Sequence, residues 1–138
     1  MHSEEASYRN LQKHLNAMPV GFPATRSGVD QRILKTLFTP AEARLATAMS
    51  YRWESADTIC QRAGQAGLLD PAVGDGPAML DAMAEKGSIF KTDSDPGPRY
   101  ALLPFVLGMF EFQLRHLTRA FYEDSARYFR EAFGLAYL

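Results

Sequence analysis

The chain has 138 residues, of which 46% are hydrophobic and 12% aromatic, and this is enough for one domain with a hydrophobic core. A formal net charge of −1 gives the molecule no basic field to attract nucleic acid or an anionic membrane. The single cysteine excludes an internal disulfide and a metal cage made only of cysteines. The acidic start lacks a signal peptide and no apolar run is long enough to span a bilayer, so we expect a cytoplasmic protein.

Residues 1–38 are predicted to form an N-terminal helical extension made of two helices. Residues 4–15 have helical periodicity, and the apolar side chains on one face are Tyr8, Leu11 and Leu15. Ser27 is predicted to cap the second helix, because its hydroxyl can accept a hydrogen bond from the first turn. The apolar face of that helix consists of Val29, Ile33, Leu34 and Leu37, with Phe38 at its end.

Between these helices, residues 18–25 carry a distinctive turn. Two prolines and a glycine occur within six residues, so a helix cannot continue through them. We interpret the segment as an ordered turn whose Val20 and Phe22 enter the core. A ligand pocket lined by this turn is the alternative.

Residues 39–103 are predicted to form a winged helix-turn-helix. Thr39 can cap its first helix, Pro40 suits the first helical position, and Glu42 completes a capping box. Leu45, Ala48, Met49 and Arg52 fall at helical spacing, and only Arg52 is polar, so the core-facing stripe of this helix is narrow and we expect Trp53 to close it.

The second helix is predicted to begin after Ser55 and to end at Gly64, a residue suited to the left-handed cap. It would bury Ile59, Cys60 and Ala63. The third is predicted to begin at Pro77 and to end at Gly87, with Met79, Leu80 and Met83 at core spacing.

Two alternating runs, residues 88–92 and 99–103, then flank a turn at 93–98 and predict a β-hairpin. The predicted fold is therefore mainly α with a small β-hairpin: a winged helix-turn-helix flanked by N-terminal and C-terminal helices.

Residues 104–138 are predicted to form a C-terminal helical hairpin that packs on the same core. Residues 105–117 would be a helix that is apolar almost all round and must be covered on every side, by this chain or by a second subunit. The last helix, 118–133, carries an aromatic stripe on one face, and we expect this stripe to pack either in the hydrophobic core or in a dimer interface. The stripe comprises Tyr122, Ala126, Phe129 and Phe133, with Phe121 and Tyr128 beside it. The opposite face, expected to be solvated, holds Glu123, Asp124, Arg127, Arg130 and Glu131.

The third helix of the predicted winged helix, which would be the recognition helix, has a charge unsuited to DNA binding. Such a helix enters the major groove, and its affinity comes largely from lysine and arginine at phosphates. The charged residues here are four acids and one base: Asp70, Asp75, Asp81, Glu85 and Lys86. In the hairpin, the negative charges of Asp93 and Asp95 cancel the positive charges of Lys91 and Arg99. We therefore expect a protein contact from this element, and nucleic acid is an unlikely partner.

No catalytic, cofactor-binding or metal-ligating residues are predicted in this chain. His2, His14 and His116 are isolated in sequence, and Cys60 is expected to be a buried, inert thiol. The run Gly74-Asp75-Gly76 is too short for a phosphate loop and lacks its lysine. Glu111 lies among apolar residues and could be shifted in pKa, but an ion pair with Arg115 one turn later explains it more simply.

Several short motifs together cover nearly the whole chain. They are Tyr8-Arg-x-Leu11-Gln-x-His-Leu15, Met18-Pro-Val-Gly-Phe-Pro-Ala-Thr25, Ser27-Gly-Val, Arg32-Ile-Leu-Lys35, Leu37-Phe-Thr-Pro-Ala-Glu-Ala43, Tyr100-Ala-Leu, Pro104-Phe and Phe110-Glu-Phe-Gln113. The most specific is Met18 to Thr25. With these motifs the chain resembles the N-terminal region of iron-sulfur proteins of anaerobic microbes.

In that family a winged-helix-like segment precedes a ferredoxin-type domain whose cysteines hold 4Fe-4S clusters. The resemblance implies such clusters only for a missing C-terminal part, because Cys60 alone cannot hold one. It also implies that the parent protein serves an oxidoreductase system. Three apolar residues after Gly134 are typical of a domain cut from a longer protein.

Two functions from different classes follow. The first is a non-catalytic accessory domain that binds a protein partner, or a second copy through the aromatic C-terminal helices, on behalf of an iron-sulfur electron-transfer protein. The alternative is a dimeric winged-helix DNA-binding transcription regulator, for which the terminal helices would dimerise. An enzyme would need a reactive constellation that the sequence does not contain.

Overall fold

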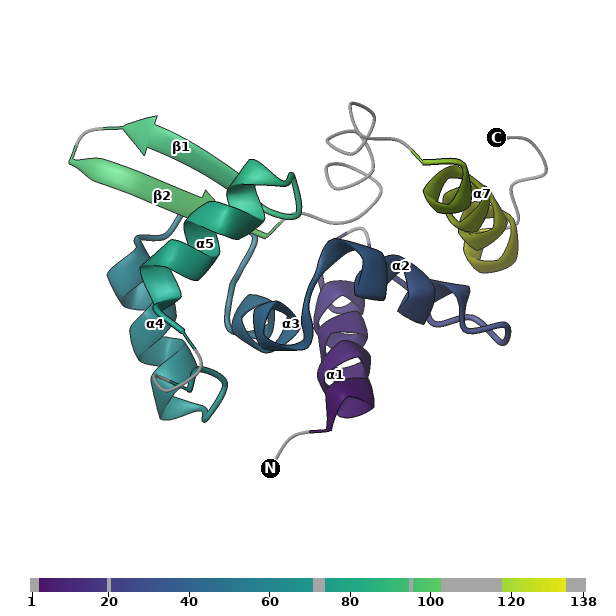
Figure 1. Cartoon of the computed structure of the whole chain (residues 1–138), viewed down its shortest axis with the longest axis horizontal. Helices are drawn as coiled ribbons and strands as arrows, with labels where there is room; N and C mark the ends of the chain where they lie inside the picture. Colours follow the sequence, from purple (N-terminus) through teal and green to yellow (C-terminus); the bar gives the residue numbers. More distant parts are fainter. Residues whose placement is uncertain (1–2, 20, 71–73, 95, 103–117, 134–138) are drawn as a thin grey trace.

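Figure 1 shows the chain as a computed structural model that describes residues 3–19, 21–70, 74–94, 96–102 and 118–133. The fold is mainly helical with a small two-stranded antiparallel sheet, as predicted. The elements run in the order α1 (Glu4–Asn16), α2 (Val29–Leu37), α3 (Pro40–Thr47), α4 (Ala56–Gln65), α5 (Gly76–Glu85), β1 (Phe90–Ser94), β2 (Gly97–Ala101) and α7 (Arg119–Phe133). The helix predicted at 105–117, Val20, and the ends of the chain lie outside the described residues.

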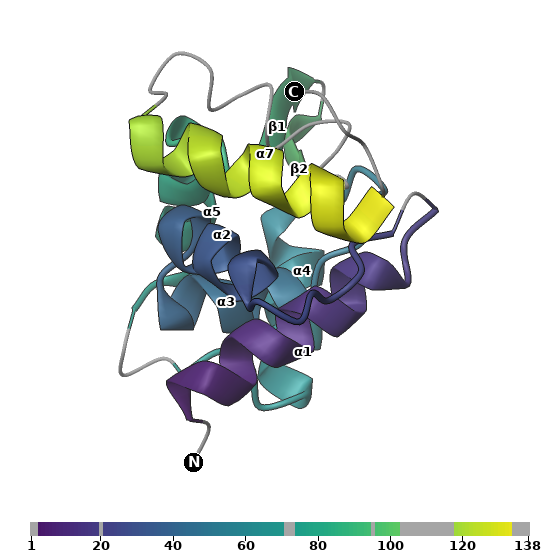
Figure 2. The same cartoon turned by 90° about the vertical axis from the view of Figure 1, so that its right-hand side faces the viewer.

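The elements fall into two neighbouring groups. Helices α4 and α5 pack on each other and against the hairpin, whereas α1 packs on α3 and α2. Helix α3 contacts both α4 and α5, so it joins the groups. Helix α7 lies across α2, on the side away from α1 (Figure 2).

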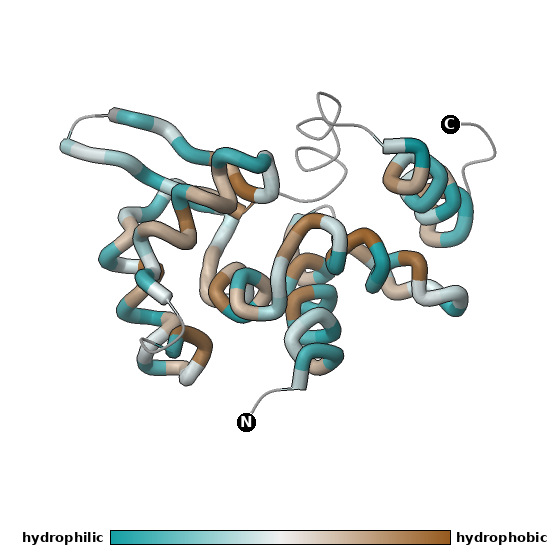
Figure 3. Tube along the Cα trace, in the orientation of Figure 1, coloured by the Kyte–Doolittle hydropathy of each residue, from teal (hydrophilic) through white to brown (hydrophobic). Residues whose placement is uncertain are grey.

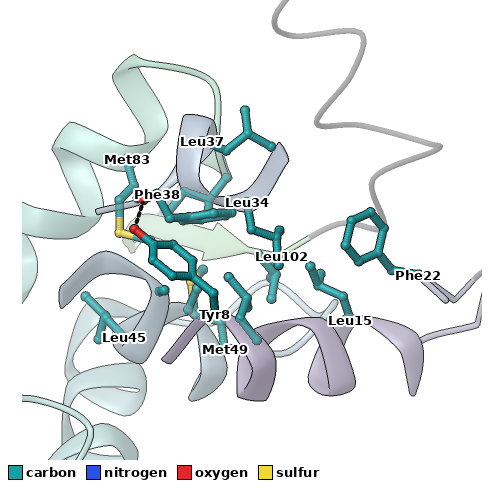
Figure 4. Packing of buried hydrophobic residues seen from close by; sticks show 14 of the residues in the cluster. Tyr8, Leu15, Phe22, Leu34, Leu37, Phe38, Leu45, Met49, Met83 and Leu102 are labelled. Atoms are coloured by element: carbon teal, nitrogen blue, oxygen red, sulfur yellow. Dashed lines mark hydrogen bonds between the residues drawn. The ribbon is translucent and has the colours of Figure 1, made fainter. Parts of the chain in front are cut away.

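The core lies where α1, α2 and α3 meet, and Figure 3 shows hydrophobic stretches of the trace in these three helices. The predicted apolar faces of α1 and α2 are confirmed, since each of those side chains is at most 4% exposed. Tyr8 adds a polar anchor, because its hydroxyl donates to the carbonyl oxygen of Phe38 at 2.7 Å (Figure 4). The largest fully buried side chains are Tyr128, Phe22, Phe38, Leu11, Leu15, Ile33, Leu34, Leu37, Leu45, Met49 and Ile59.

Helix starts agree with the sequence in one case and differ in another. At α3 the capping box is complete: Thr39 Oγ1 accepts from the Glu42 amide, and the Glu42 carboxylate accepts from the Thr39 amide. At α2 the prediction of Ser27 as the cap is wrong by one residue. Gly28 occupies the cap position with φ of 79°. The Ser27 hydroxyl still accepts a hydrogen bond from the Val29 amide at 3.3 Å, as predicted, and it donates to Glu131 of α7 at 2.9 Å. A residue without Cβ suits this left-handed backbone, which turns the chain into the helix.

The end of α4 also lies later than predicted. The helix continues past Gly64 to Gln65, and the left-handed residue is Gly67 with φ of 70°. The third predicted helix is confirmed as α5, and Gly87 ends it with φ of 83°.

In the hairpin, the strands extend two residues further into the predicted turn, and Asp93 opposes Pro98. Pro98 is tolerated because Tyr100, two residues on, points its amide away from β1, so the Pro98 nitrogen also faces away from the ladder.

The aromatic stripe of α7 is rotated relative to the prediction. Tyr122 and Phe133 are 42% and 38% exposed. The predicted solvated face is also partly engaged, because Asp124 pairs with Arg32 at 3.1 Å. Contacts with α2 on one flank therefore decide which residues of α7 turn inward. The buried residues are Phe121, Ser125, Ala126, Tyr128 and Phe129.

Candidate functional site

The segment between α3 and α4 runs beside β2 and is joined to it by a single isolated bridge outside the two-stranded sheet. Glu54 and Tyr100 exchange both backbone hydrogen bonds, at 3.0 and 2.8 Å, as an antiparallel bridge. In regular pairing the next bond from Leu102 would reach residue 52, but the Leu102 amide donates to the carbonyl oxygen of Ser50 at 2.9 Å. The chain therefore bulges between Ser50 and Glu54, and such bulges re-aim side chains away from a sheet.

This bulge, residues 51–53, presents two large aromatic side chains to solvent. Tyr51 is 48% exposed and Trp53 is 46% exposed. Arg52 lies between these two residues in the sequence. Its guanidinium carbon is 5.7 Å from the centroid of the Tyr51 ring, within the range of a cation–π contact. Half-exposed aromatics next to an arginine are the residue types that dominate binding energy in protein interfaces. We name residues 51–53 the Tyr51–Trp53 bulge.

The prediction that Trp53 closes the core stripe of α3 is wrong. The helix ends at Thr47, so helical spacing has no meaning at residue 53. Ala48 and Met49, just beyond the helix end, are buried in its place. One feature of the sequence could have indicated that Trp53 lies outside α3. The aromatic–arginine–aromatic run stands directly before Ser55, the cap of the next helix, and is therefore part of the connection between two helices.

A charged cluster under the bulge holds its two ends together. The Glu54 carboxylate accepts from the Ser50 hydroxyl at 2.9 Å and pairs with Arg62 of α4. Arg62 also donates to the carbonyl oxygen of Ala48 at 2.8 Å, which ties α4 to the end of α3. The hydrogen bond from Arg62 holds the pKa of Glu54 below its ordinary value, despite the opposing effect of burial. These contacts hold the residues at the two ends of the bulge in place.

Of the acidic residues predicted for the third helix, Asp81 makes contacts within the chain, although its side chain stays 54% exposed. The Asp81 carboxylate accepts from the Tyr100 hydroxyl and pairs with Lys91 of β1 at 3.0 Å, and these two contacts lower its pKa. Lys86, just after the helix, pairs with Glu42 of α3. Between α5 and β1 lies an open hollow of about 470 Å³, lined by Asp81, Ala84, Glu85, Ile89, Phe90 and Lys91.

The residues singled out for chemistry are scattered. His14 donates from Nε2 to the carbonyl oxygen of Met49 at 2.5 Å, which makes it a structural link between α1 and the end of α3. Cys60 lies partly buried against the core, and burial raises the pKa of its thiol. Asp75 takes the cap position of α5 without a side-chain capping bond. His2, His116, Glu111 and Arg115 lie outside the described residues.

Within the described ranges, no three histidine, cysteine, aspartate or glutamate side chains lie together as a metal site would require. In the same part of the chain, no helix is long and apolar enough to cross a membrane.

The turn at residues 18–25 is part of the structural core. Phe22 is fully buried and stacks on Tyr128 of α7 with ring centroids 4.6 Å apart, which confirms its predicted place. The Tyr128 hydroxyl donates to the carbonyl oxygen of Pro23 at 2.8 Å. On the other side, Gln12 and Asn16 of α1 bond to the carbonyl and the amide of Phe22. The turn therefore joins α1 to α7.

No protein-family model, curated protein or solved structure matches this chain.

Proposed function

We propose that this chain is a non-catalytic winged-helix domain that docks a protein partner for an iron-sulfur electron-transfer protein. The observation that carries the proposal is the Tyr51–Trp53 bulge, in which two half-exposed aromatics flank an arginine on a fixed backbone. Aromatic residues and arginine are enriched at the centres of protein interfaces, and a preformed site loses little entropy on binding.

The order of elements supports the winged-helix part of the proposal. Helix α3, the bridged segment at Glu54, then α4, α5 and the β1–β2 hairpin follow one another as in a winged helix whose first strand is short. The bulge would then lie at the free edge of the wing sheet. Exposed edges with side chains suited to contact are common binding sites.

Charge pairing favours a protein partner over DNA. Three cations of this half of the chain are paired internally: Arg62 with Glu54, Lys86 with Glu42 and Lys91 with Asp81. Each pair would have to break before the cation could neutralise a phosphate, and DNA affinity depends on such neutralisation. A dimeric DNA-binding regulator stays the second candidate because the winged-helix order is the frame that such regulators use.

The iron-sulfur part of the proposal rests on the sequence motifs alone. The 4Fe-4S clusters would be held by cysteines in another part of the parent protein, and this domain would bring that part to its redox partner. The parent protein, purified anaerobically from its own cells, is then expected to be larger than 15.4 kDa and to absorb visible light as iron-sulfur clusters do. A colourless 15.4 kDa protein would favour the regulator.

The docking part is tested in the intact parent protein with a matched pair of variants. Trp53→Ser should impair electron transfer to the partner. Tyr122→Ser, which removes a similarly exposed aromatic from α7, should leave it unchanged. Equal activity of both variants and the unaltered protein would count against docking through the bulge, and loss only with Tyr122→Ser would point to α7. Salt-sensitive binding to duplex DNA would support the regulator instead.

A further inference from the structure

We infer that the Tyr51–Trp53 bulge binds an acidic segment of its protein partner, with a carboxylate of that segment on Arg52 and its apolar side chains against Tyr51 and Trp53. This inference rests on the proposed docking function and adds the chemistry of the partner.

The electrostatic argument starts from Arg52. Arg62, Lys86 and Lys91 are each paired with a carboxylate of this chain, but no carboxylate within the described ranges lies at ion-pair distance from Arg52. Its guanidinium carbon lies 5.7 Å from the centroid of the Tyr51 ring, and no side-chain hydrogen bond to another described residue engages its N–H groups, so they are available to a partner. A carboxylate is the ligand whose geometry matches that fork in a bidentate contact.

The surroundings strengthen such a contact. Tyr51 and Trp53, the neighbours of Arg52 in the sequence, supply exposed apolar surface, and a partner that covers the Tyr51 ring beside the guanidinium would exclude water from the ion pair. An ion pair in a water-poor interface is stronger than one in solvent. A partner segment with an aspartate or glutamate beside an aromatic or aliphatic residue would satisfy both parts of the bulge at once.

Two other occupants fit less well. Nucleic acid bases can stack on aromatic side chains, but a strand also needs several cations along its backbone, and the neighbouring Arg62 and Lys91 are paired. A second copy of this chain would have to offer an acidic segment, and on α5 the Asp81 carboxylate would first have to leave its contacts with Tyr100 and Lys91.

The experiment uses the whole 138-residue chain and a library of random peptides displayed on phage. The chain contains one tryptophan, so fluorescence excited at the indole band reports on Trp53 alone when the peptide has none. We expect selected peptides to carry an aspartate or glutamate beside an apolar residue and to shift Trp53 emission to the blue. Arg52→Glu should weaken them by about tenfold or more, and replacing the peptide acid by lysine should restore affinity for that variant.

The matched control is Arg119→Glu, which makes the same change of charge at a side chain that is 92% exposed on α7. It should bind the peptides as the unaltered chain does. If peptides shift Trp53 emission but show no preference for acids and no response to Arg52→Glu, the inference is wrong while the docking function stands. If no peptide perturbs Trp53, the docking function itself is contradicted. Tighter binding of single-stranded oligothymidylate, or concentration-dependent self-association that buries Trp53, would also overturn the inference.

Discussion

The stacked pair Phe22 and Tyr128 should couple the N-terminal turn to the C-terminal helix, and a double-mutant cycle measures that coupling. Both side chains are fully buried, and their rings lie 4.6 Å apart at an interplanar angle of 23°. An aromatic pair of this kind contributes about 0.5–1.5 kcal/mol beyond its buried area. The variants Phe22→Leu and Tyr128→Leu keep an apolar side chain at each position, so the chain should still fold.

The expected free energies of unfolding follow from the contacts that each change removes. Phe22→Leu should cost about 1–2 kcal/mol, mainly from imperfect repacking. Tyr128→Leu should cost about 2–4 kcal/mol, because it also removes the hydrogen bond to the carbonyl oxygen of Pro23. The double variant should lose less than the sum, by about 0.5–1.5 kcal/mol. Urea unfolding followed by circular dichroism gives all four values.

A coupling within about 0.3 kcal/mol of zero would refute the reasoning, because independent sites are additive to that extent. Tyr128→Phe is the control that isolates the hydroxyl. It should cost about 1 kcal/mol and leave the coupling to Phe22 intact.

Two further predictions concern single sites near the bulge and α5. Gly76→Ala should destabilise the chain by about 1–3 kcal/mol, because the new Cβ would lie 2.5 Å from the Cys60 sulfur, and Cys60→Ala should recover part of the loss. The matched change Gly64→Ala, where no atom lies within 4 Å, should stabilise α4 by about 0.5–1 kcal/mol; equal effects at both glycines in urea unfolding would contradict the packing at Gly76. Glu54 should make the stability of the chain depend on pH in the acid range. The hydrogen bond from Arg62 lowers the pKa of Glu54 in the folded chain below the ordinary 4.5. The stabilisation by the ionised Glu54 is therefore fully present above pH 4.5 and is lost as the pH falls through the lower pKa of the folded chain. Glu54→Gln should therefore flatten the acid limb of a plot of unfolding free energy against pH, at a cost of about 1 kcal/mol or less near neutrality, and an unchanged acid limb would argue against the pair with Arg62.

Features encoded over a few neighbouring residues could be predicted from the sequence. The capping box of Thr39 and Glu42 is local, and it forms as expected. The buried faces of α1 and α2 follow from helical periodicity, which needs no knowledge of the partner helix. Phe22 in the core also agrees with its place in a turn rich in proline and glycine.

Features decided by distant contacts could not be predicted in the same way. The orientation of α7 depends on Arg32 and Phe22, which are about a hundred residues away in sequence, so Tyr122 and Phe133 turned out exposed. Trp53 was assigned to the core because helical spacing was extended past the end of α3. The bulge arises because the Leu102 amide donates to the carbonyl oxygen of Ser50. No local pattern in the sequence predicts this hydrogen bond between distant residues.

The most direct test of the docking function is the environment of Trp53, measured by ¹⁹F NMR of the chain labelled with fluorotryptophan. Because the chain has one tryptophan, the spectrum should contain one tryptophan resonance, and in the free chain this resonance should respond to exchange of H₂O for D₂O. Addition of a redox protein that co-purifies with the proposed iron-sulfur parent protein should shift the resonance and remove that solvent response. A resonance that ignores solvent in the free chain, or one that the partner leaves unchanged, would contradict docking through the Tyr51–Trp53 bulge.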